Sequence, residues 1–250
     1  MLGWSAERFV TSATEPEPPD FAPRYEELVR RRVGREPLAY ILGRQEFWGL
    51  SFEVSPAVLI PRSETELIVE LALELLPSNA NASDVADLCT GSGCVAVALA
   101  TAITGVSLIA TDISEAALEV ARRNAARHGV ADRIEFCCAD LLAGLPGPFD
   151  LIACNPPYVA DRDKRGLQPE VRDYEPGVAL FGGADGFHIL ERLVGGAAAY
   201  LRPGGHLLFE FGLGQDERVE SLVERTDRLR LVELRCDLQG IARTAVVERV

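Results

Sequence analysis

Four consecutive residues, Asn155, Pro156, Pro157 and Tyr158, have the chemistry needed to hold a planar NH2 group. They follow an apolar run at 149–154, which predicts a buried strand. The asparagine amide oxygen and a proline carbonyl can each accept one N–H, and the tyrosine ring offers a flat face. Open α/β sheets bind ligands at the carboxyl ends of their strands. The tetrapeptide is therefore a candidate site for chemistry on an amide or amino nitrogen.

A glycine loop lies upstream, between a predicted strand at 85–89 and a predicted helix at 94–101. Its residues are Asp87, Leu88, Cys89, Thr90, Gly91, Ser92, Gly93 and Cys94. The glycines allow a sharp turn that brings backbone amides close to a carboxylate or phosphate of a ligand. The same stretch also fits the loose GxGxxA dinucleotide pattern. The loop alone therefore does not separate a nicotinamide enzyme from a methyltransferase.

Two acidic residues follow the next two predicted strands. Asp112 comes after the strand at 107–111, where an acid in such folds accepts hydrogen bonds from a ribose diol. It could instead only begin the turn into the next helix, but Ser114 is already available as the helix cap. Asp140 follows the strand at 134–138 and could meet the amine of adenine, with Leu141 against the ring. A plain loop aspartate is the alternative reading of Asp140.

Methylation of an amide nitrogen depends on positioning, because the nitrogen lone pair is delocalised into the carbonyl group. If the Asn155 side-chain oxygen and the Pro156 carbonyl each accept one N–H, the nitrogen is aimed and its developing positive charge is stabilised. Proline keeps this backbone extended, and Tyr158 can stack on the target. Placed after the glycine loop and Asp112, the tetrapeptide favours a methyltransferase over an ordinary turn.

From residue 85 onward, strand-like and helix-like segments alternate, which is typical of a parallel sheet with right-handed crossovers. Apolar runs predict strands at 85–89, 107–111, 134–138, 149–154, 206–211, 229–236 and 242–248. Apolar periodicity and capping residues predict helices at 94–101, 114–128, 186–200 and 215–225. The fold class is therefore α/β, a mostly parallel seven-stranded sheet with a terminal antiparallel hairpin.

The chain before this sheet predicts a small separate segment. Residues 1–43 form a short N-terminal part, in which 1–24 is expected to be flexible and 25–43 helical. Residues 44–250 form the main domain, which opens with a β-hairpin over 46–60 and a helix over 65–76.

Composition narrows the classes of protein. The chain of 250 residues has a formal net charge of −13, which opposes loose binding along nucleic acid and favours a protein substrate. Clusters of cations at 30–35 and 162–165 are local exceptions. With neither a membrane-length apolar run nor a signal-peptide pattern, a cytoplasmic protein without a membrane partner is expected. The six cysteines lack metal-site spacing, so we expect reduced thiols and no metal.

Several stretches of the chain resemble one family. They are Pro37-Leu38-Ala39-Tyr40-Ile41-Leu42-Gly43, Glu46-Phe47-Trp48-Gly49-Leu50, Leu59-Ile60-Pro61-Arg62-Ser63-Glu64-Thr65-Glu66, the glycine loop, Asn155 to Tyr158, and Ala179-Leu180-Phe181-Gly182-Gly183. Together they resemble the class I S-adenosylmethionine-dependent methyltransferases, and within them the release-factor glutamine methyltransferases of the HemK/PrmC type. The resemblance covers the chain from about residue 25 to its end.

The resemblance implies a Rossmann-like class I fold and methyl transfer from S-adenosylmethionine to the side-chain amide nitrogen of a protein glutamine. The implied substrate is the Gly-Gly-Gln motif of peptide-chain release factors. The implied cofactor site comprises Asp87, Cys89, Thr90, Gly91, Ser92, Gly93, Asp112, Asp140, Leu141 and Asn155. Phe47, Pro61 and Arg62 resemble a lid beside the cofactor, and residues 155–158 the glutamine clamp.

The chain departs from this family in two places. Ser63 stands where the family usually has proline. Most of the family's N-terminal helical domain, which helps to hold the release factor, is expected to be missing, because only 25–43 resembles its final part. The open alternatives are a ribosomal-protein glutamine methyltransferase, a DNA or RNA amino-group methyltransferase, a nicotinamide-dependent oxidoreductase and a non-catalytic cofactor-binding scaffold.

Overall fold

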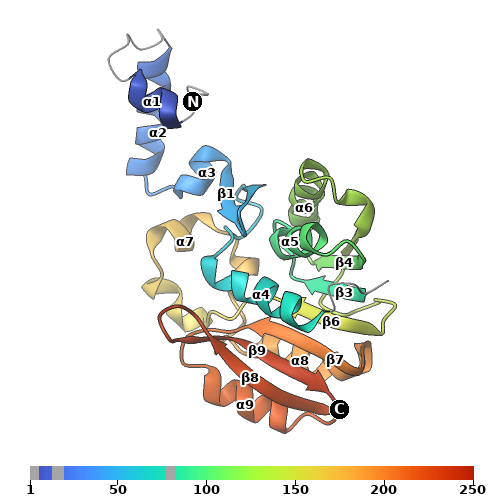
Figure 1. Ribbon diagram of the computed structural model, residues 1–250. Coiled ribbons are helices and arrows are strands. Elements are labelled where there is room, and N and C mark those ends of the chain that lie inside the picture. The colour runs from blue at the N-terminus through green and yellow to red at the C-terminus, as the bar shows by residue number, and fades with distance from the viewer. Residues whose placement is uncertain (1–5, 13–19, 77–82) are drawn as a thin grey trace.

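A seven-stranded sheet forms the centre of the protein, in a computed structural model that describes residues 6–12, 20–76 and 83–250 (Figure 1). The strand order is β5-β4-β3-β6-β7-β9-β8. The strands are β3 Ser83–Leu88, β4 Val106–Asp112, β5 Ile134–Cys138, β6 Phe149–Cys154, β7 Leu201–Glu210, β8 Leu229–Cys236 and β9 Ala242–Arg249. Neighbours from β5 to β7 are parallel, whereas β9 is antiparallel to β7 and β8. The predicted mostly parallel sheet with a terminal antiparallel hairpin is confirmed.

The strand order reverses between β3 and β6. From β3 the chain proceeds through β4 to β5 on one side, and from β6 to β7 on the other. Leu88 and Cys154, the last residues of β3 and β6, pair with each other, so the glycine loop and the tetrapeptide leave adjacent strand ends. Such a reversal opens a crevice at the carboxyl ends of the strands, where these folds bind ligands.

Helices cover both faces of the sheet (Figure 1). On one face lie α4 Glu66–Leu75, α5 Cys94–Ala102 and α6 Glu115–Arg127, and on the other α8 His188–Tyr200 and α9 Asp216–Glu224. Successive side chains of a strand point to opposite faces. Val85 of β3 accordingly packs in the first core, and its neighbour Ala86 packs in the second. Both faces of the central strands are apolar for this reason.

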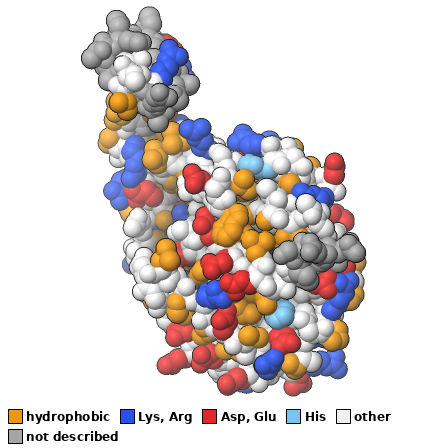
Figure 2. Space-filling model, in the orientation of Figure 1, with side chains coloured by type: hydrophobic (Ala, Val, Ile, Leu, Met, Phe, Trp, Pro, Cys, Tyr) orange, Lys and Arg blue, Asp and Glu red, His pale blue; other side chains and the backbone are white. Residues whose placement is uncertain are grey.

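Three N-terminal helices precede this body; the first two stand off it, whereas the third packs against it (Figures 1 and 2). They are α1 Ala6–Thr11, α2 Phe21–Val33 and α3 Leu38–Leu42, and no residue of α2 is buried. Polar contacts hold this part to the body: Tyr40 Oη donates to the Val58 carbonyl at 2.6 Å, and Tyr174 Oη donates to the Gly34 carbonyl at 2.5 Å. The contacts between the two parts therefore lie near residues 34–40, at the C-terminal end of the N-terminal part.

Three element boundaries differ from the sequence expectation. The helix expected from residue 25 begins at Phe21, and Ala6–Thr11 is helical, while 1–5 and 13–19 of the segment expected to be flexible lie outside the described residues. The hairpin expected over 46–60 is confined to β1 Arg44–Phe47 and β2 Leu50–Glu53. β7 begins five residues early, at Leu201, because an irregularity between Phe149 and Leu151 lets the glycine turn stay in the strand.

Short elements complete the chain between the larger ones. They are the 3-10 turns η1 Ser63–Thr65, η2 Ala131–Arg133, η3 Asp161–Gly166 and η4 Gly177–Ala179, and the helix α7 Pro169–Tyr174. Among the described residues, no helix is both long and apolar enough to cross a membrane. The same residues hold no cluster of three or more His, Cys, Asp or Glu side chains placed for a metal ion. All six cysteines are free thiols.

Candidate active site

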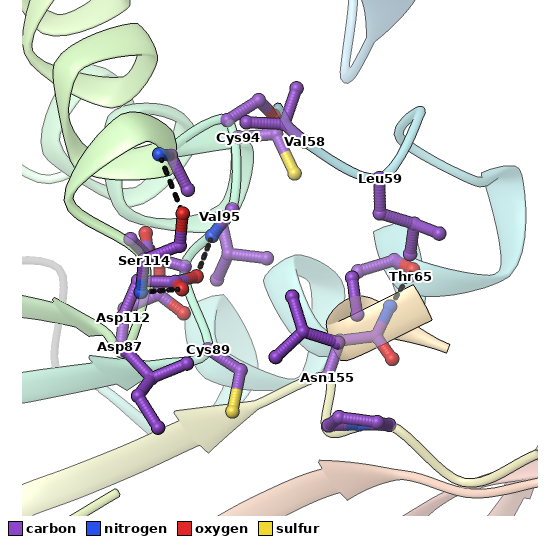
Figure 3. Close-up of a pocket in the computed structure, with 18 of the residues that line it drawn as sticks. Val58, Leu59, Thr65, Asp87, Cys89, Cys94, Val95, Asp112, Ser114 and Asn155 are labelled. Carbon is purple, nitrogen blue, oxygen red and sulfur yellow. Dashed lines mark hydrogen bonds between the residues drawn. The ribbon is translucent and has the colours of Figure 1, made fainter. Parts of the chain in front are cut away.

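A cavity lies at the carboxyl ends of β3, β4, β5 and β6, where the strand order reverses (Figure 3). Segments distant in the chain meet there: the loop before α4, the ends of four strands, and the stretch from η4 to α8. Its walls include these predicted site residues: Pro61, Arg62, Asp87, Cys89, Thr90, Gly91, Ser92, Asp112, Asp140, Leu141, Asn155 and Pro157. The structure therefore brings most of the predicted site together in one cavity.

Asp87 is the second-last residue of β3 and organises the glycine loop. Its Oδ2 accepts hydrogen bonds from Thr90 Oγ1 at 2.6 Å and from the Ala96 backbone N–H at 3.1 Å. Burial raises the pKa of this carboxyl to about 7, although both hydrogen bonds act in the opposite direction. The cavity therefore contains an acid that changes charge near neutral pH.

Asp112 at the end of β4 links the glycine loop to the next helix. Its Oδ2 accepts from the Gly91 N–H and its Oδ1 from the Ser114 N–H, each at 2.9 Å. Ser114 is the expected helix cap, since its Oγ accepts from the Ala117 N–H at 3.2 Å. Burial raises the pKa of Asp112. This carboxylate has a structural task in addition to any ligand.

The β5 end contributes Asp140 and Leu141. Asp140 Oδ2 accepts from Arg192 Nη2 of α8 at 2.7 Å, and Leu141 is buried with φ +53°. Cys89, also on the cavity wall, has φ +56°. A positive φ is costly for residues other than glycine and tends to persist at functional sites. Two such residues facing one cavity support a ligand site there.

Asn155 leaves β6 with its side chain fixed. Its Nδ2 donates to Thr65 Oγ1 at 2.9 Å, which leaves the amide oxygen as the group available to a target N–H (Figure 3). Pro157 lines the same cavity, and its carbonyl is so close to Gly182 that a β-carbon there would lie 2.5 Å from the oxygen. The segment after η4 therefore packs tightly against the tetrapeptide and holds it in place.

Four predicted site residues do not line the cavity. Phe47 is 1% exposed and packs edge-on against Phe52 in the core, because the short hairpin turns this ring inward and not toward the cavity. Gly93 starts α5, where a β-carbon would lie 3.0 Å from that of Ala121. Pro156 and Tyr158 belong to the loop behind the wall. The predicted roles, an acceptor carbonyl for Pro156 and a stacking ring for Tyr158, stay predictions, and the structure adds that the Tyr158 phenol donates to Glu210 at 2.7 Å.

The structure adds site residues that the sequence analysis passed over. Thr65 holds Asn155, and Glu210 at the end of β7 accepts from Thr65 Oγ1 at 2.7 Å and from Tyr158 Oη at 2.7 Å. The signal for Glu210 was a single acid inside an apolar strand. Glu175, 6% exposed, accepts from the Ile60 N–H at 3.1 Å and from Arg62 at 2.5 Å. It fixes the loop that carries Pro61 and Arg62.

Comparison with known proteins places this geometry in a family. A release factor glutamine methyltransferase of Geobacter sulfurreducens is 48% identical over 200 residues, which cover 80% of this chain and 69% of that protein. A release factor glutamine methyltransferase of Bradyrhizobium diazoefficiens is 42% identical over 231 residues, which cover 92% of this chain and 78% of that protein. The chain belongs to the release factor glutamine methyltransferase family. The resemblance noted in the sequence is thereby confirmed.

Two family models match the chain, and a solved structure shares its fold. The model described as the methyltransferase small domain matches residues 64–168, and the PrmC N-terminal domain model matches 1–43. The latter match also includes residues 1–24, which precede the stretch of resemblance noted in the sequence. A ribosomal protein L11 methylase structure from Lactobacillus delbrueckii subsp. bulgaricus shares the fold, with a TM-score of 0.56 and 23% identity over 75% of this chain and 80% of that one. The Rossmann-like class I fold is confirmed.

Proposed function

We propose that this chain transfers a methyl group from S-adenosylmethionine to the side-chain amide nitrogen of the glutamine in the Gly-Gly-Gln motif of a peptide-chain release factor. The observation that carries the proposal is the fixed amide of Asn155, whose oxygen is left free for a target N–H beside a cavity lined by acids. The names of relatives that are 42–48% identical support the same substrate.

The cavity residues fit the proposed cofactor in charge. S-adenosylmethionine supplies an electrophilic methyl group on a positively charged sulfur. Asp87, Asp112 and Asp140 line the cavity, and their carboxylates favour a cationic ligand with hydroxyl and ammonium donors. We infer that Asp112, which lines the cavity at the end of β4, accepts hydrogen bonds from the ribose diol. Arg192 and Arg62 are each paired with an acid.

The target side of the cavity is built by Asn155 and its neighbours. The amide oxygen of Asn155 and the carbonyl of Pro156 accept the two N–H groups of the glutamine amide and point its nitrogen at the methyl group. When bound, S-adenosylmethionine would supply the methyl group, and the nitrogen that accepts this group would gain positive charge. The two acceptors stabilise that charge until one N–H proton is lost to water.

The experiment that tests the proposed function is methylation of a purified release factor. The protein is incubated with S-adenosylmethionine and the factor, and the tip peptide is analysed by mass spectrometry. We expect one added methyl group on the glutamine. Parallel reactions with a ribosomal protein and with nucleic acid cover the alternative substrates. Cofactor binding together with an unmodified tip glutamine would reject the release-factor assignment.

The basic cluster at 30–35 gives little support to nucleic acid as the target. Its four arginines pair with three glutamates, two of them with the same one, so most of the positive charge is locally balanced. The pairs are Arg30–Glu27, Arg31–Glu36, Arg32–Glu170 and Arg35–Glu170. The face in Figure 2 likewise shows acidic side chains among the basic ones. Affinity for phosphates depends on unbalanced cations, so the structure favours a protein substrate.

Cofactor affinity should depend on pH through Asp87. The pKa of this carboxyl is raised to about 7 by burial, so the group is mostly protonated at pH 6 and mostly ionised at pH 8. A cationic cofactor prefers the ionised form, and binding at pH 6 must release the proton. We expect Kd to be about tenfold weaker at pH 6 than at pH 8. Calorimetry in buffers of different ionisation enthalpy measures Kd and the released protons.

The matched variant for this pH effect is Asp87→Asn. It keeps an acceptor for Thr90 and Ala96 but removes the titrating group. Its affinity should be nearly constant between pH 6 and pH 8, at a weaker level than that of the unmodified protein at pH 8. An unchanged tenfold pH dependence in Asp87→Asn would assign the effect to another group.

A further inference from the structure

A chain of three hydrogen bonds runs behind the cavity. It begins at Asn155 Nδ2, which donates to Thr65 Oγ1 at 2.9 Å. Thr65 Oγ1 donates to Glu210 Oε2 at 2.7 Å, and Tyr158 Oη donates to Glu210 Oε1 at 2.7 Å. One carboxylate thus connects both ends of the tetrapeptide through groups that belong to three different elements: η1, β7 and the loop after β6.

The network is shielded from water. Thr65 is 2% exposed and Glu210 is 1% exposed. Burial, followed by the charge of Glu210, raises the pKa of Tyr158 well above its usual range, so the phenol remains a donor. A buried carboxylate needs such donors, because an unpaired charge in this environment is costly. The two donors therefore stabilise the buried Glu210 carboxylate, and the carboxylate holds both donors in place.

The direction of these bonds decides how Asn155 faces the cavity. A threonine hydroxyl has one proton, and Thr65 uses this proton in its hydrogen bond to the Glu210 carboxylate. The oxygen of Thr65 then has only lone pairs to offer, so the NH2 group of Asn155 turns toward it and the amide oxygen turns away. Without this constraint an asparagine amide can rotate and present a donor, which would repel a target N–H.

We propose that Thr65 and Glu210 are positioning residues for methyl transfer, which fix the Asn155 amide with its oxygen toward the target nitrogen. The inference rests on the proposed role of Asn155 in the reaction. Thr65 acts directly on the amide, and Glu210 acts through Thr65 while it also anchors Tyr158. Thr65 lies in the cavity wall, and Glu210 is not among the residues that line the cavity.

Substitution of Thr65 tests the proposal. Thr65→Val keeps the shape of the side chain but removes the hydroxyl, and we expect kcat to fall about tenfold or more because the amide is no longer held in line. Affinity for S-adenosylmethionine should stay within about twofold, since the three cavity carboxylates are untouched. Thr65→Ser, which restores the hydroxyl, should recover most of kcat. Thr226→Val is the matched control, since the Thr226 hydroxyl bonds to the Leu222 carbonyl in α9.

A second background separates this inference from the proposed function. In Asn155→Ala, the change Thr65→Val should cause little further loss of kcat, because the amide that it positions is already gone. If Asn155→Ala itself keeps full kcat, the role of Asn155 is wrong. If Asn155→Ala is impaired but Thr65→Val turns over normally, only the positioning role is wrong.

Glu210→Gln provides an independent variant should Thr65→Val fold poorly. Thr65 and Tyr158 donate to different oxygens of Glu210, and the glutamine replaces one of these oxygens with an NH2 group, so one of the two hydroxyls loses its acceptor. We expect a several-fold fall in kcat with cofactor affinity retained. Equal losses of kcat and cofactor affinity in this variant would indicate general disruption and would overturn the proposal.

Discussion

Replacing Asn155 with alanine is expected to lower kcat by about 10²–10³-fold, the usual effect of removing one preorganised hydrogen-bonding group from a transition state. The amide oxygen is the group left free by the bond from Nδ2 to Thr65, and the truncated side chain leaves the target nitrogen with one acceptor fewer. Initial rates at saturating cofactor and release factor measure this loss.

The affinity of the same variant for cofactor separates target binding from cofactor binding. Asn155 lines the cavity but follows β6, whereas the three acids lie at the carboxyl ends of β3, β4 and β5. Kd for S-adenosylmethionine should therefore change by no more than about twofold to threefold. Gln239→Ala removes an exposed amide in the turn between β8 and β9, so it controls for the loss of an amide side chain away from the cavity. A large loss of cofactor affinity in Asn155→Ala would contradict a role on the target side.

Replacing Asp112 with alanine should have the opposite signature. Loss of hydrogen bonds between a charged carboxylate and a ribose diol is expected to raise Kd for S-adenosylmethionine about 10–100-fold. The substitution also removes the acceptor for the Gly91 N–H, so the glycine loop loses one of its supports. At saturating cofactor, the fold decrease in kcat should be much smaller than the fold increase in Kd for S-adenosylmethionine. Isothermal calorimetry and initial rates provide the two readouts.

A matched charge change makes this result specific. Asp227→Ala removes the same charge from an exposed position after α9, so it controls for the reduction in net negative charge. Its cofactor affinity should equal that of the unmodified protein. If Asp112→Ala also binds normally, the carboxylate serves only the two backbone N–H groups that it contacts in the structure.

The sheet could be predicted from the sequence because its signals are local. Each strand of the parallel part is a short apolar run, and the glycine loop and the Ser114 cap follow from residue types in a few adjacent positions. Strand order and the cavity then follow from general rules of parallel sheets. The acids Asp87, Asp112 and Asp140 could be placed at the site for the same reason.

Contacts between distant segments could not be predicted in this way. Thr65 and Glu210 are separated by 145 positions, and nothing near either residue in the sequence indicates the other. Phe47 shows a different limit. An aromatic side chain in a short strand can cover a ligand or enter the core, and only the packing against Phe52 decides for the core.

The reversal of strand order between β3 and β6 divides the site into two parts that can change independently by mutation. The proposed cofactor contacts come mainly from one side, at the ends of β3, β4 and β5, and the proposed target contacts come from the other, at the end of β6, where Glu210 of β7 supports them through Thr65. Mutations in the second part can change which nitrogen is accepted while the first part stays intact. A protein with this strand order can therefore acquire a new substrate while its cofactor-binding residues stay unchanged.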